Sequence, residues 1–180
     1  MVMITKKGRY RFVVISPLLG LAFKFPILHP LKAFRLAWRL VQQKDYKYLW
    51  IMITWPINSP DIRGYGDLMF GAIWVNWSEF MFFWKTRHPF LQPTYFSFFG
   101  LLNIQKAGAP CVIKEKVLCD ALYDIAGETI FDDPHHLTSP GNYCFDNGKF
   151  RIIDYGSKMT YRMILESGEK VMAFFSKPPQ

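Results

Sequence analysis

An amide and a carboxylate lie at the two ends of a short predicted hairpin in the last third of the chain. Asn142 precedes one strand-like segment, Asp146-Asn147-Gly148 is a typical hairpin turn, and Asp154 follows the second strand-like segment. Amide and carboxylate oxygens suit Mg²⁺, which bridges the phosphates of ATP during phosphoryl transfer. An amide and a carboxylate held close together by a hairpin therefore predict a candidate Mg²⁺ site, and an ordinary hairpin is the alternative.

The same segment resembles the catalytic and metal-binding loops of the protein-kinase-like superfamily, including choline kinases and aminoglycoside kinases. In that superfamily the pattern His-x-Asp-x-x-x-x-Asn leads through a hairpin to Asp-Phe-Gly. His135, Asn142 and Asp154 fall on matching positions, and Tyr155 replaces the phenylalanine. The resemblance implies ATP and Mg²⁺ as cofactors, with Asn142 and Asp154 as metal ligands.

One part of the pattern is missing, because Leu137 occupies the position of the catalytic aspartate. Leucine cannot accept a proton from a substrate hydroxyl group. Asp132 and Asp133 lie just upstream and are the candidates for a substitute catalytic base. His135 and His136 could also act as a base, but we expect both histidines to hold the loop in place. The resemblance therefore implies weak or no phosphotransfer.

A glutamate in the apolar helical segment 67–86 provides a second point of resemblance. Glu79 precedes a link at residues 88–91 with the sequence His-Pro-Phe-Leu, much as the αC-helix glutamate of a kinase precedes a similar link. A carboxylate buried among bulky apolar side chains is costly unless a cation pairs with it. We therefore expect a cationic partner for Glu79, and a partly exposed glutamate is the alternative.

Lys24 is the expected partner, because the segment Leu-Ala-Phe-Lys-Phe resembles the kinase strand whose lysine binds the α- and β-phosphates of ATP and pairs with the helix glutamate. The separation of 55 residues between Lys24 and Glu79 is larger than in the family. Residues 30–66 would therefore have to be an insertion. Gln42 and Gln43 lie nearer the usual distance, but a neutral amide would not supply the charge.

The turn between the first two predicted strands corresponds to the glycine-rich loop that covers the phosphates in kinases. Only Gly8 of the pattern Gly-x-Gly-x-x-Gly remains, and Lys6 and Lys7 could contact phosphate as point charges. Lys7 and Gly8 therefore join Lys24 and Glu79 as candidate cofactor-binding residues.

Periodicity and turn residues predict the elements that must position these side chains. Strands are predicted over residues 1–5, 9–16, 21–25, 95–99, 101–105, 143–145 and 150–153, with a further strand at 170–175. Helices are predicted over residues 30–43, 67–86 with Asp67 as the cap, 114–125, and a short stretch after 158. Residues 48–55 fit either a strand or a buried helix.

This order of elements predicts an α+β fold of the protein-kinase-like type. An antiparallel N-lobe sheet with an αC-like helix would span residues 1–107, including the insertion near 30–66, and a truncated C-lobe would span residues 108–180. No Ala-Pro-Glu segment follows Gly156, so we do not expect the platform that docks peptide substrates in a full kinase.

The composition limits the class of protein and its partners. The chain has 180 residues, a net charge of +8 and 51% hydrophobic residues, which excludes a disordered chain and favours anionic partners. The charge is spread along the chain, so nucleic acid is not favoured. Three cysteines without metal-ligand spacing fit the cytoplasm. Residues 67–84 are apolar but contain charges, so a buried helix is favoured over membrane contact.

Together these features predict a pseudokinase, a kinase-like protein that binds ATP and Mg²⁺ and acts as a regulator through a protein partner or as a homo-oligomer. Two alternatives stay open. One is an active small phosphotransferase with Asp132 or Asp133 as the base. The other is a binding or inhibitory module that binds no nucleotide and keeps only the fold.

Overall fold

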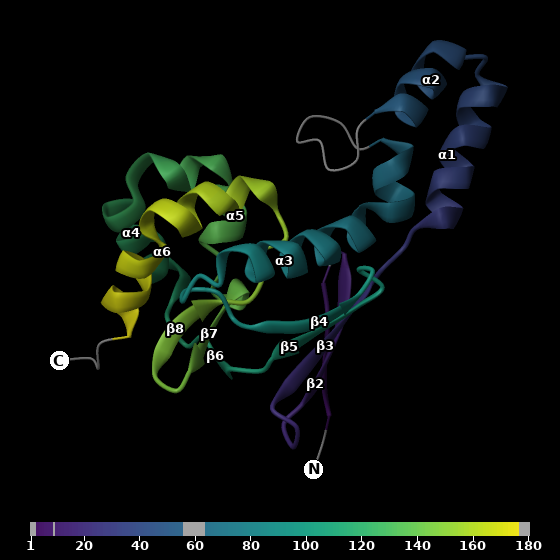
Figure 1. Ribbon diagram of the computed structural model, residues 1–180. Coiled ribbons are helices and arrows are strands. Elements are labelled where there is room, and N and C mark those ends of the chain that lie inside the picture. Colours follow the sequence, from purple (N-terminus) through teal and green to yellow (C-terminus); the bar gives the residue numbers. More distant parts are fainter. Residues whose placement is uncertain (1–2, 9, 56–63, 177–180) are drawn as a thin grey trace.

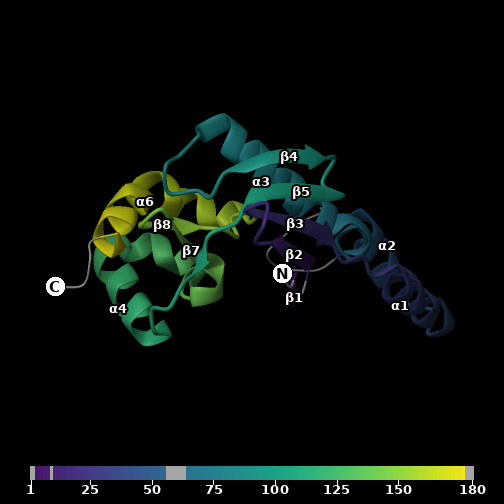
Figure 2. The same ribbon diagram turned by 90° about the horizontal axis from the view of Figure 1, so that it is seen from below.

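A five-stranded antiparallel sheet forms one half of the molecule (Figures 1 and 2), in the order β1-β2-β3-β5-β4. The computed structural model describes residues 3–8, 10–55 and 64–176, apart from the side chains of residues 134 and 135. The strands are β1 (Ile4–Lys7), β2 (Arg11–Ser16), β3 (Leu21–Pro26), β4 (Thr94–Phe98) and β5 (Leu102–Lys106). The mixed α/β class predicted from the sequence is therefore confirmed.

Helix α3 (Ala72–Thr86) lies across one face of this sheet (Figure 1). Asn76 Nδ2 donates a hydrogen bond to the carbonyl oxygen of Gly100 at 2.9 Å, and Asn103 Nδ2 donates to the carbonyl oxygen of Asn76 at 2.7 Å. Gly100 has a φ of +77°, and a Cβ there would lie 2.2 Å from a carbonyl oxygen of α3. The turn between β4 and β5 therefore needs glycine to approach the helix this closely.

The second half of the molecule contains a three-stranded antiparallel sheet and most of the remaining helices. Its strands are β6 (Ala109–Pro110), β7 (Tyr143–Asp146) and β8 (Lys149–Ile152), in that order. Its helical segments are α4 (Glu115–Ala126), η2 (Gly127–Asp132), α5 (Pro134–Leu137), η3 (Pro140–Asn142), η4 (Lys158–Thr160) and α6 (Tyr161–Phe175).

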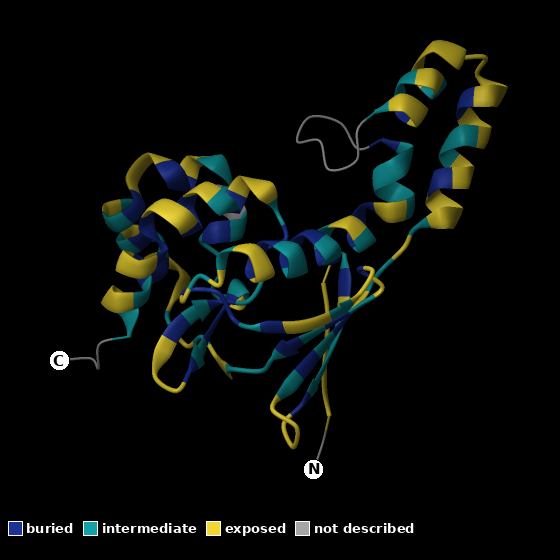
Figure 3. Cartoon of the chain, in the orientation of Figure 1, coloured by how far each residue is buried: buried dark blue, intermediate teal, exposed yellow. Residues whose placement is uncertain are grey.

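The largest hydrophobic core lies in this second half (Figure 3). Leu118 and Leu122, one helical turn apart on α4, are fully buried with Phe150 of β8 and Ile164 of α6. Spacing of three or four residues on the helices places these side chains on one face. The core therefore holds the β7–β8 hairpin, which carries Asn142 and Asp154 at its two ends, against α4 and α6.

The chain between β3 and α3 leaves the sheet and forms a helical hairpin (Figures 1 and 3). Its helices are α1 (Pro30–Gln42) and α2 (Tyr46–Thr54), and they pack against each other. Proline at the first helical position favours a helix start, as Pro30 does for α1. The described part of the excursion expected near residues 30–66 is therefore a pair of helices.

One predicted element is wrong, and the structure decides between the two alternatives for another. Residues 170–175 are not a strand but the end of α6, because Met163, Ser167 and Val171, four residues apart, form a buried helical face. Residues 48–55 belong mostly to a helix, α2, in which Met52 is buried and most other side chains are not.

The start of the helix that carries Glu79 also differs. Asp67 does not cap it, because Gly66 occupies the cap position of a π-helical segment, Asp67–Gly71, that runs into α3. The buried face of α3 includes Phe82, as expected for this apolar segment. Among the described residues, no helix is both long enough and apolar enough to cross a membrane.

Candidate functional site

The ion pair expected between Lys24 and Glu79 is present, between β3 and α3. Lys24 Nζ lies 2.8 Å from Glu79 Oε1, and the side chains are 6% and 0% exposed. Their separation of 55 positions in the sequence does not prevent the contact, because the α1–α2 hairpin leaves the sheet between β3 and α3. The sequence therefore identified both residues of the pair.

A third charged residue, Arg11 of β2, completes the coordination of this glutamate. Arg11 Nη1 lies 2.5 Å from Glu79 Oε2, and its Nη2 donates to Asp154 Oδ1. The sequence reasoning missed Arg11. Its signal was the strand register, because Val13 lies directly opposite Lys24 and Arg11 lies two residues from Val13, on the same face.

Asp154, in the loop after β8, is the fourth charged residue of this group. Besides its bond to Arg11, this loop accepts a hydrogen bond from Lys24 Nζ at the carbonyl oxygen of Ile153, at 2.5 Å. The Asp154 side chain is 35% exposed. Arg11, Lys24, Glu79 and Asp154, which we call the four-charge cluster, therefore contain two cations and two anions.

Burial and mutual attraction act against each other within the four-charge cluster. Burial lowers the pKa of Lys24, and Glu79 opposes that change. Burial would also lower the pKa of Arg11, but Asp154 and Glu79 outweigh it and raise the pKa. Burial would raise the pKa of Asp154, but Arg11, with His136 and Lys24, lowers it. Arg11 and Asp154 are therefore held in their charged forms.

Asn142 reaches Asp154 through a histidine. His136 Nε2 lies 2.7 Å from the Asp154 carbonyl oxygen, and Asn142 Nδ2 donates to the His136 carbonyl oxygen at 2.7 Å. The backbone N–H of Ile153 donates to the Asn142 carbonyl oxygen at 2.8 Å. The two candidate metal ligands therefore lie on adjacent segments, and the amide oxygen of Asn142 is the atom that could bind a cation.

A metal ion at this place would compete with Arg11. Asp154 Oδ1, one of the two carboxylate oxygens that a metal ion could bind, accepts a hydrogen bond from the guanidinium group. Among the described residues, no group of three or more histidine, cysteine, aspartate or glutamate side chains is arranged to hold a metal. In this conformation, a metal ion that binds Oδ1 of Asp154 would therefore have to displace Arg11.

The candidate catalytic bases, and Leu137 at the position of the catalytic aspartate, lie outside the four-charge cluster. Leu137 is fully buried in the hydrophobic core, and its carbonyl oxygen accepts a hydrogen bond from Tyr143 at 2.6 Å. Asp132 ends η2, and its charge acts on Arg162 of α6. In the part of the chain that the structure describes, no hydrogen bond or ion pair joins Asp132 or Asp133 to the four-charge cluster.

Lys7 and Gly8 lie at the turn between β1 and β2. Lys7 pairs with Phe12 within the sheet and belongs to β1, so the turn begins later than expected. Both residues are exposed, and the Gly8 N–H donates to the Arg11 carbonyl oxygen at 2.8 Å. Within the described residues, no hydrogen bond or ion pair joins the Lys7 side chain to Lys24, Glu79 or Asp154.

Tyr155 and Gly156 fix the loop that carries Asp154. The Tyr155 hydroxyl lies 2.7 Å from Thr94 Oγ1 and also donates to the Gln92 carbonyl oxygen at 2.7 Å. A Cβ at Gly156 would lie 2.5 Å from a side-chain carbon of Val75 on α3. The loop is therefore anchored to β4 and α3, the elements that also position Glu79.

The comparisons with known proteins give no family. No protein-family model matches the chain, and no curated protein or solved structure matches it significantly. The function must therefore be argued from the contacts of this chain.

Proposed function

We propose that this protein is a kinase-like protein that binds the phosphates of ATP at the four-charge cluster and has weak or no phosphotransfer activity. The proposal is supported first by the order of elements, since α3 lies between β3 and β4 in the chain and packs on their sheet. The resemblance of the hairpin and its flanking loops to kinase sequences points the same way.

The observation that carries the proposal is the Lys24–Glu79 pair beside Asp154. In phosphoryl-transfer enzymes of the kinase type, a strand lysine held by a helix glutamate faces the phosphates, and an aspartate after a hairpin faces the metal. Here a buried cation is held at 2.8 Å by a buried anion, and a partly exposed carboxylate lies beside it. That combination of charges suits an anionic ligand that binds together with a metal cation.

The weak or absent catalysis is argued from the loop around His136. It is His136 whose ring contacts the Asp154 carbonyl oxygen, which makes it the better counterpart of the histidine in His-x-Asp. Counted from His136, the position of the aspartate is Thr138; counted from His135, it is Leu137. Neither residue is a carboxylate, so neither can act as the general base.

Arg11 supplies the cation that a metal would otherwise provide. Arg11 is bonded to both Glu79 and Asp154, and we expect its guanidinium group to contact phosphate oxygens, which guanidinium groups bind well. We therefore expect ATP binding to depend less on Mg²⁺ than in an active kinase. If Mg²⁺ binds, Asp154 and Asn142 would hold it and it would neutralise phosphate charge, after Arg11 has left Asp154.

The same arginine favours a second candidate function. Because the four-charge cluster is neutral and satisfied by its own members, the fold can also exist as a binding or inhibitory module without nucleotide. Among the residues that the structure describes, no contact of Asp132 or Asp133 with the four-charge cluster supports an active phosphotransferase. In either binding role, we expect the protein to act as a regulator through a protein partner or through a second copy of itself.

Titration calorimetry with ATP, with and without Mg²⁺, tests the proposal. We expect ATP binding by the intact protein, and loss of binding in Lys24→Ala. The control is Asp146→Ala, because Asp146 is a carboxylate of the same hairpin that pairs with Lys106 at 2.7 Å. Absence of ATP binding by the folded, intact protein would instead favour the second candidate function, a binding or inhibitory module that binds no nucleotide. ATP turnover removed by Asp133→Asn would instead support the active phosphotransferase.

A further inference from the structure

Helix α1 turns a row of apolar side chains towards solvent. Leu31, Phe34, Trp38 and Val41 follow a spacing of three and four residues, which places them on one face of a helix. Their exposed fractions lie between 41% and 70%. The opposite apolar residues, Ala33 and Leu40, are buried in the hairpin. Only half of the apolar face of α1 is therefore covered by the protein, and we call the other half the α1 stripe.

Cations border the α1 stripe. Lys32, Arg35 and Arg39, spaced by three and four residues, are exposed on the neighbouring face of the helix, which contains no acidic residue. Residues 30–54 contain five lysines and arginines and one acidic residue, Asp45. The hairpin therefore has a net charge of +4, half of the net charge of the whole chain.

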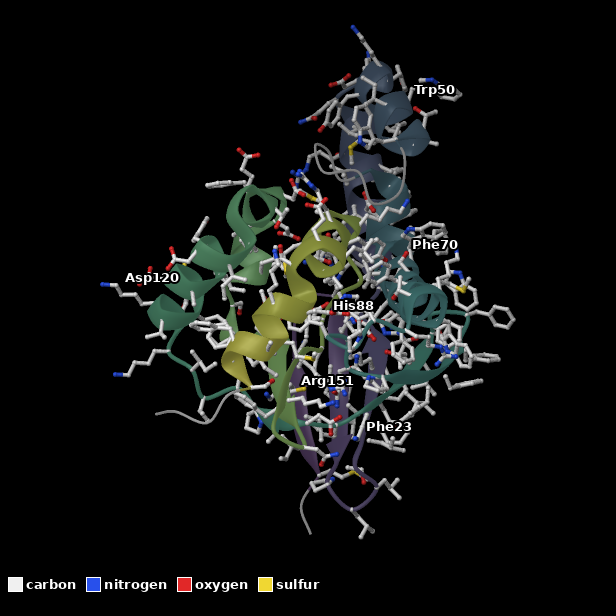
Figure 4. All side chains as sticks on the ribbon, turned by 60° about the vertical axis from the view of Figure 1, so that its left-hand side comes forward. Phe23, Trp50, Phe70, His88, Asp120 and Arg151 are labelled. Carbon is white, nitrogen blue, oxygen red and sulfur yellow. The ribbon has the colours of Figure 1, made fainter. Side chains whose placement is uncertain are left out.

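Helix α2 adds a second exposed row. Tyr46, Trp50 and Ile53, again spaced by four and three residues, are each at least 54% exposed. Figure 4 shows Trp50 near the end of the hairpin, with its ring pointing away from the protein. Tryptophan and tyrosine prefer the interface between lipid headgroups and acyl chains. The type of aromatic residue therefore fits a membrane surface as well as the charge does.

Much of the surface of the hairpin is exposed among the residues that the structure describes. In Figures 1 and 3 it extends away from both the sheet and the second half of the molecule, with exposed residues on both helices. An amphipathic helix with apolar and aromatic residues on one face and lysine or arginine on the other lies in the plane of a membrane interface. No spanning helix is needed for such binding.

We propose that the α1–α2 hairpin docks on the surface of a membrane rich in anionic phospholipids. The α1 stripe enters the headgroup region, and Lys32, Arg35 and Arg39 contact the phosphate and carboxylate groups of the lipids. An acidic protein or a second copy of this chain could also cover an apolar face. A second copy would bring the same positive hairpin against itself, which the net charge of +4 over residues 30–54 opposes. The docking is independent of ATP binding.

Flotation with lipid vesicles tests the proposal on the intact chain. Vesicles of phosphatidylcholine with phosphatidylserine are compared with vesicles of phosphatidylcholine alone. One variant is Arg35→Gln with Arg39→Gln, and its control is Lys114→Gln with Lys116→Gln, two exposed lysines beside and within α4. Each cation near an anionic surface contributes about a fivefold change in binding, so the first variant should bind about 25-fold more weakly.

A second variant tests the apolar contribution. Phe34→Ser with Trp38→Ser should abolish flotation, whereas Phe98→Ser with Phe174→Ser, both 53% exposed elsewhere on the surface, should not. Circular dichroism establishes that each variant is folded. Binding to anionic vesicles only, weakened by salt and by both hairpin variants, supports the proposal. No flotation of the intact protein, or a dimer that Phe34→Ser with Trp38→Ser converts to a monomer without any vesicle binding, overturns it.

Discussion

Replacing Glu79 with glutamine tests the physical account of the four-charge cluster. The change keeps the volume of the side chain but removes the anion that joins Arg11 to Lys24. Two charge-assisted hydrogen bonds, of 2.5 Å and 2.8 Å, are affected, and each such bond contributes about 1.5–3 kcal/mol. Breaking a buried ion pair costs about 3–5 kcal/mol. Because the amide oxygen can still accept one bond, we expect a loss of about 3 kcal/mol in the free energy of unfolding.

Urea denaturation followed by circular dichroism measures this loss. The control is Glu166→Gln, because Glu166 pairs with Arg162 at 3.1 Å on the exposed surface of α6, where ion pairs contribute little. The double variant Lys24→Met with Glu79→Gln should recover part of the stability, since Lys24 no longer leaves an unpaired buried charge and Arg11 still has an acidic partner. If Glu79→Gln and Glu166→Gln destabilise the protein equally, the reasoning is refuted.

Three further predictions concern single residues of the site and the fold. Arg11→Gln frees the carboxylate of Asp154, so Mg²⁺ should raise the melting temperature of this variant and not that of the intact protein; equal shifts would contradict competition between Arg11 and a metal. Although burial opposes it, Arg11 lowers the pKa of Asp154, so the unfolded chain takes up this proton first as the pH falls. The free energy of unfolding should therefore decrease below about pH 4. Denaturation at several pH values should show a less steep decrease in Asp154→Asn than in the intact protein. Gly100→Ala and Gly148→Ala both strain a positive φ, but only the former meets a carbonyl oxygen, that of Ile73 at 2.2 Å. Denaturation should show Gly100→Ala to be less stable than Gly148→Ala by about 1–3 kcal/mol. Equal stabilities of the two variants would contradict the close approach of Gly100 to α3.

Residues with a strong local signal could be predicted from the sequence. A glutamate among bulky apolar residues requires an opposite charge when buried, and the resemblance of the segment around Lys24 to a kinase strand indicated which cation supplies it. The antiparallel strands and the α4 helix likewise follow from alternation and helical periodicity over short stretches. The long separation of Lys24 and Glu79 predicted an excursion of the chain near residues 30–66, and its described part contains the helices α1 and α2.

Features that depend on register or on distant packing could not be predicted. Arg11 joins the four-charge cluster because of its position opposite β3, which a sequence read along one strand does not display. Residues 170–175 have strand-like composition, but they continue the buried face of α6 that includes Met163, Ser167 and Val171, and this face selects the helix. Proximity in sequence indicated Asp132 and Asp133 as candidate bases, but within the described part of the chain no hydrogen bond or ion pair joins either residue to the four-charge cluster.

The central claim, that nucleotide phosphates bind beside Lys24, is tested most directly with an acyl phosphate derivative of ATP. When the phosphates lie beside a lysine, its Nζ attacks the acyl carbonyl, an amide forms and ATP leaves. Burial lowers the pKa of Lys24, although Glu79 opposes this change. The amine of Lys24 therefore loses its proton more readily than that of an ordinary lysine. Peptide mass spectrometry should find the label on Lys24 and show that excess ATP prevents it. No label on Lys24, or a label that excess ATP reduces no more than it does at the exposed Lys114, would contradict the proposed nucleotide site.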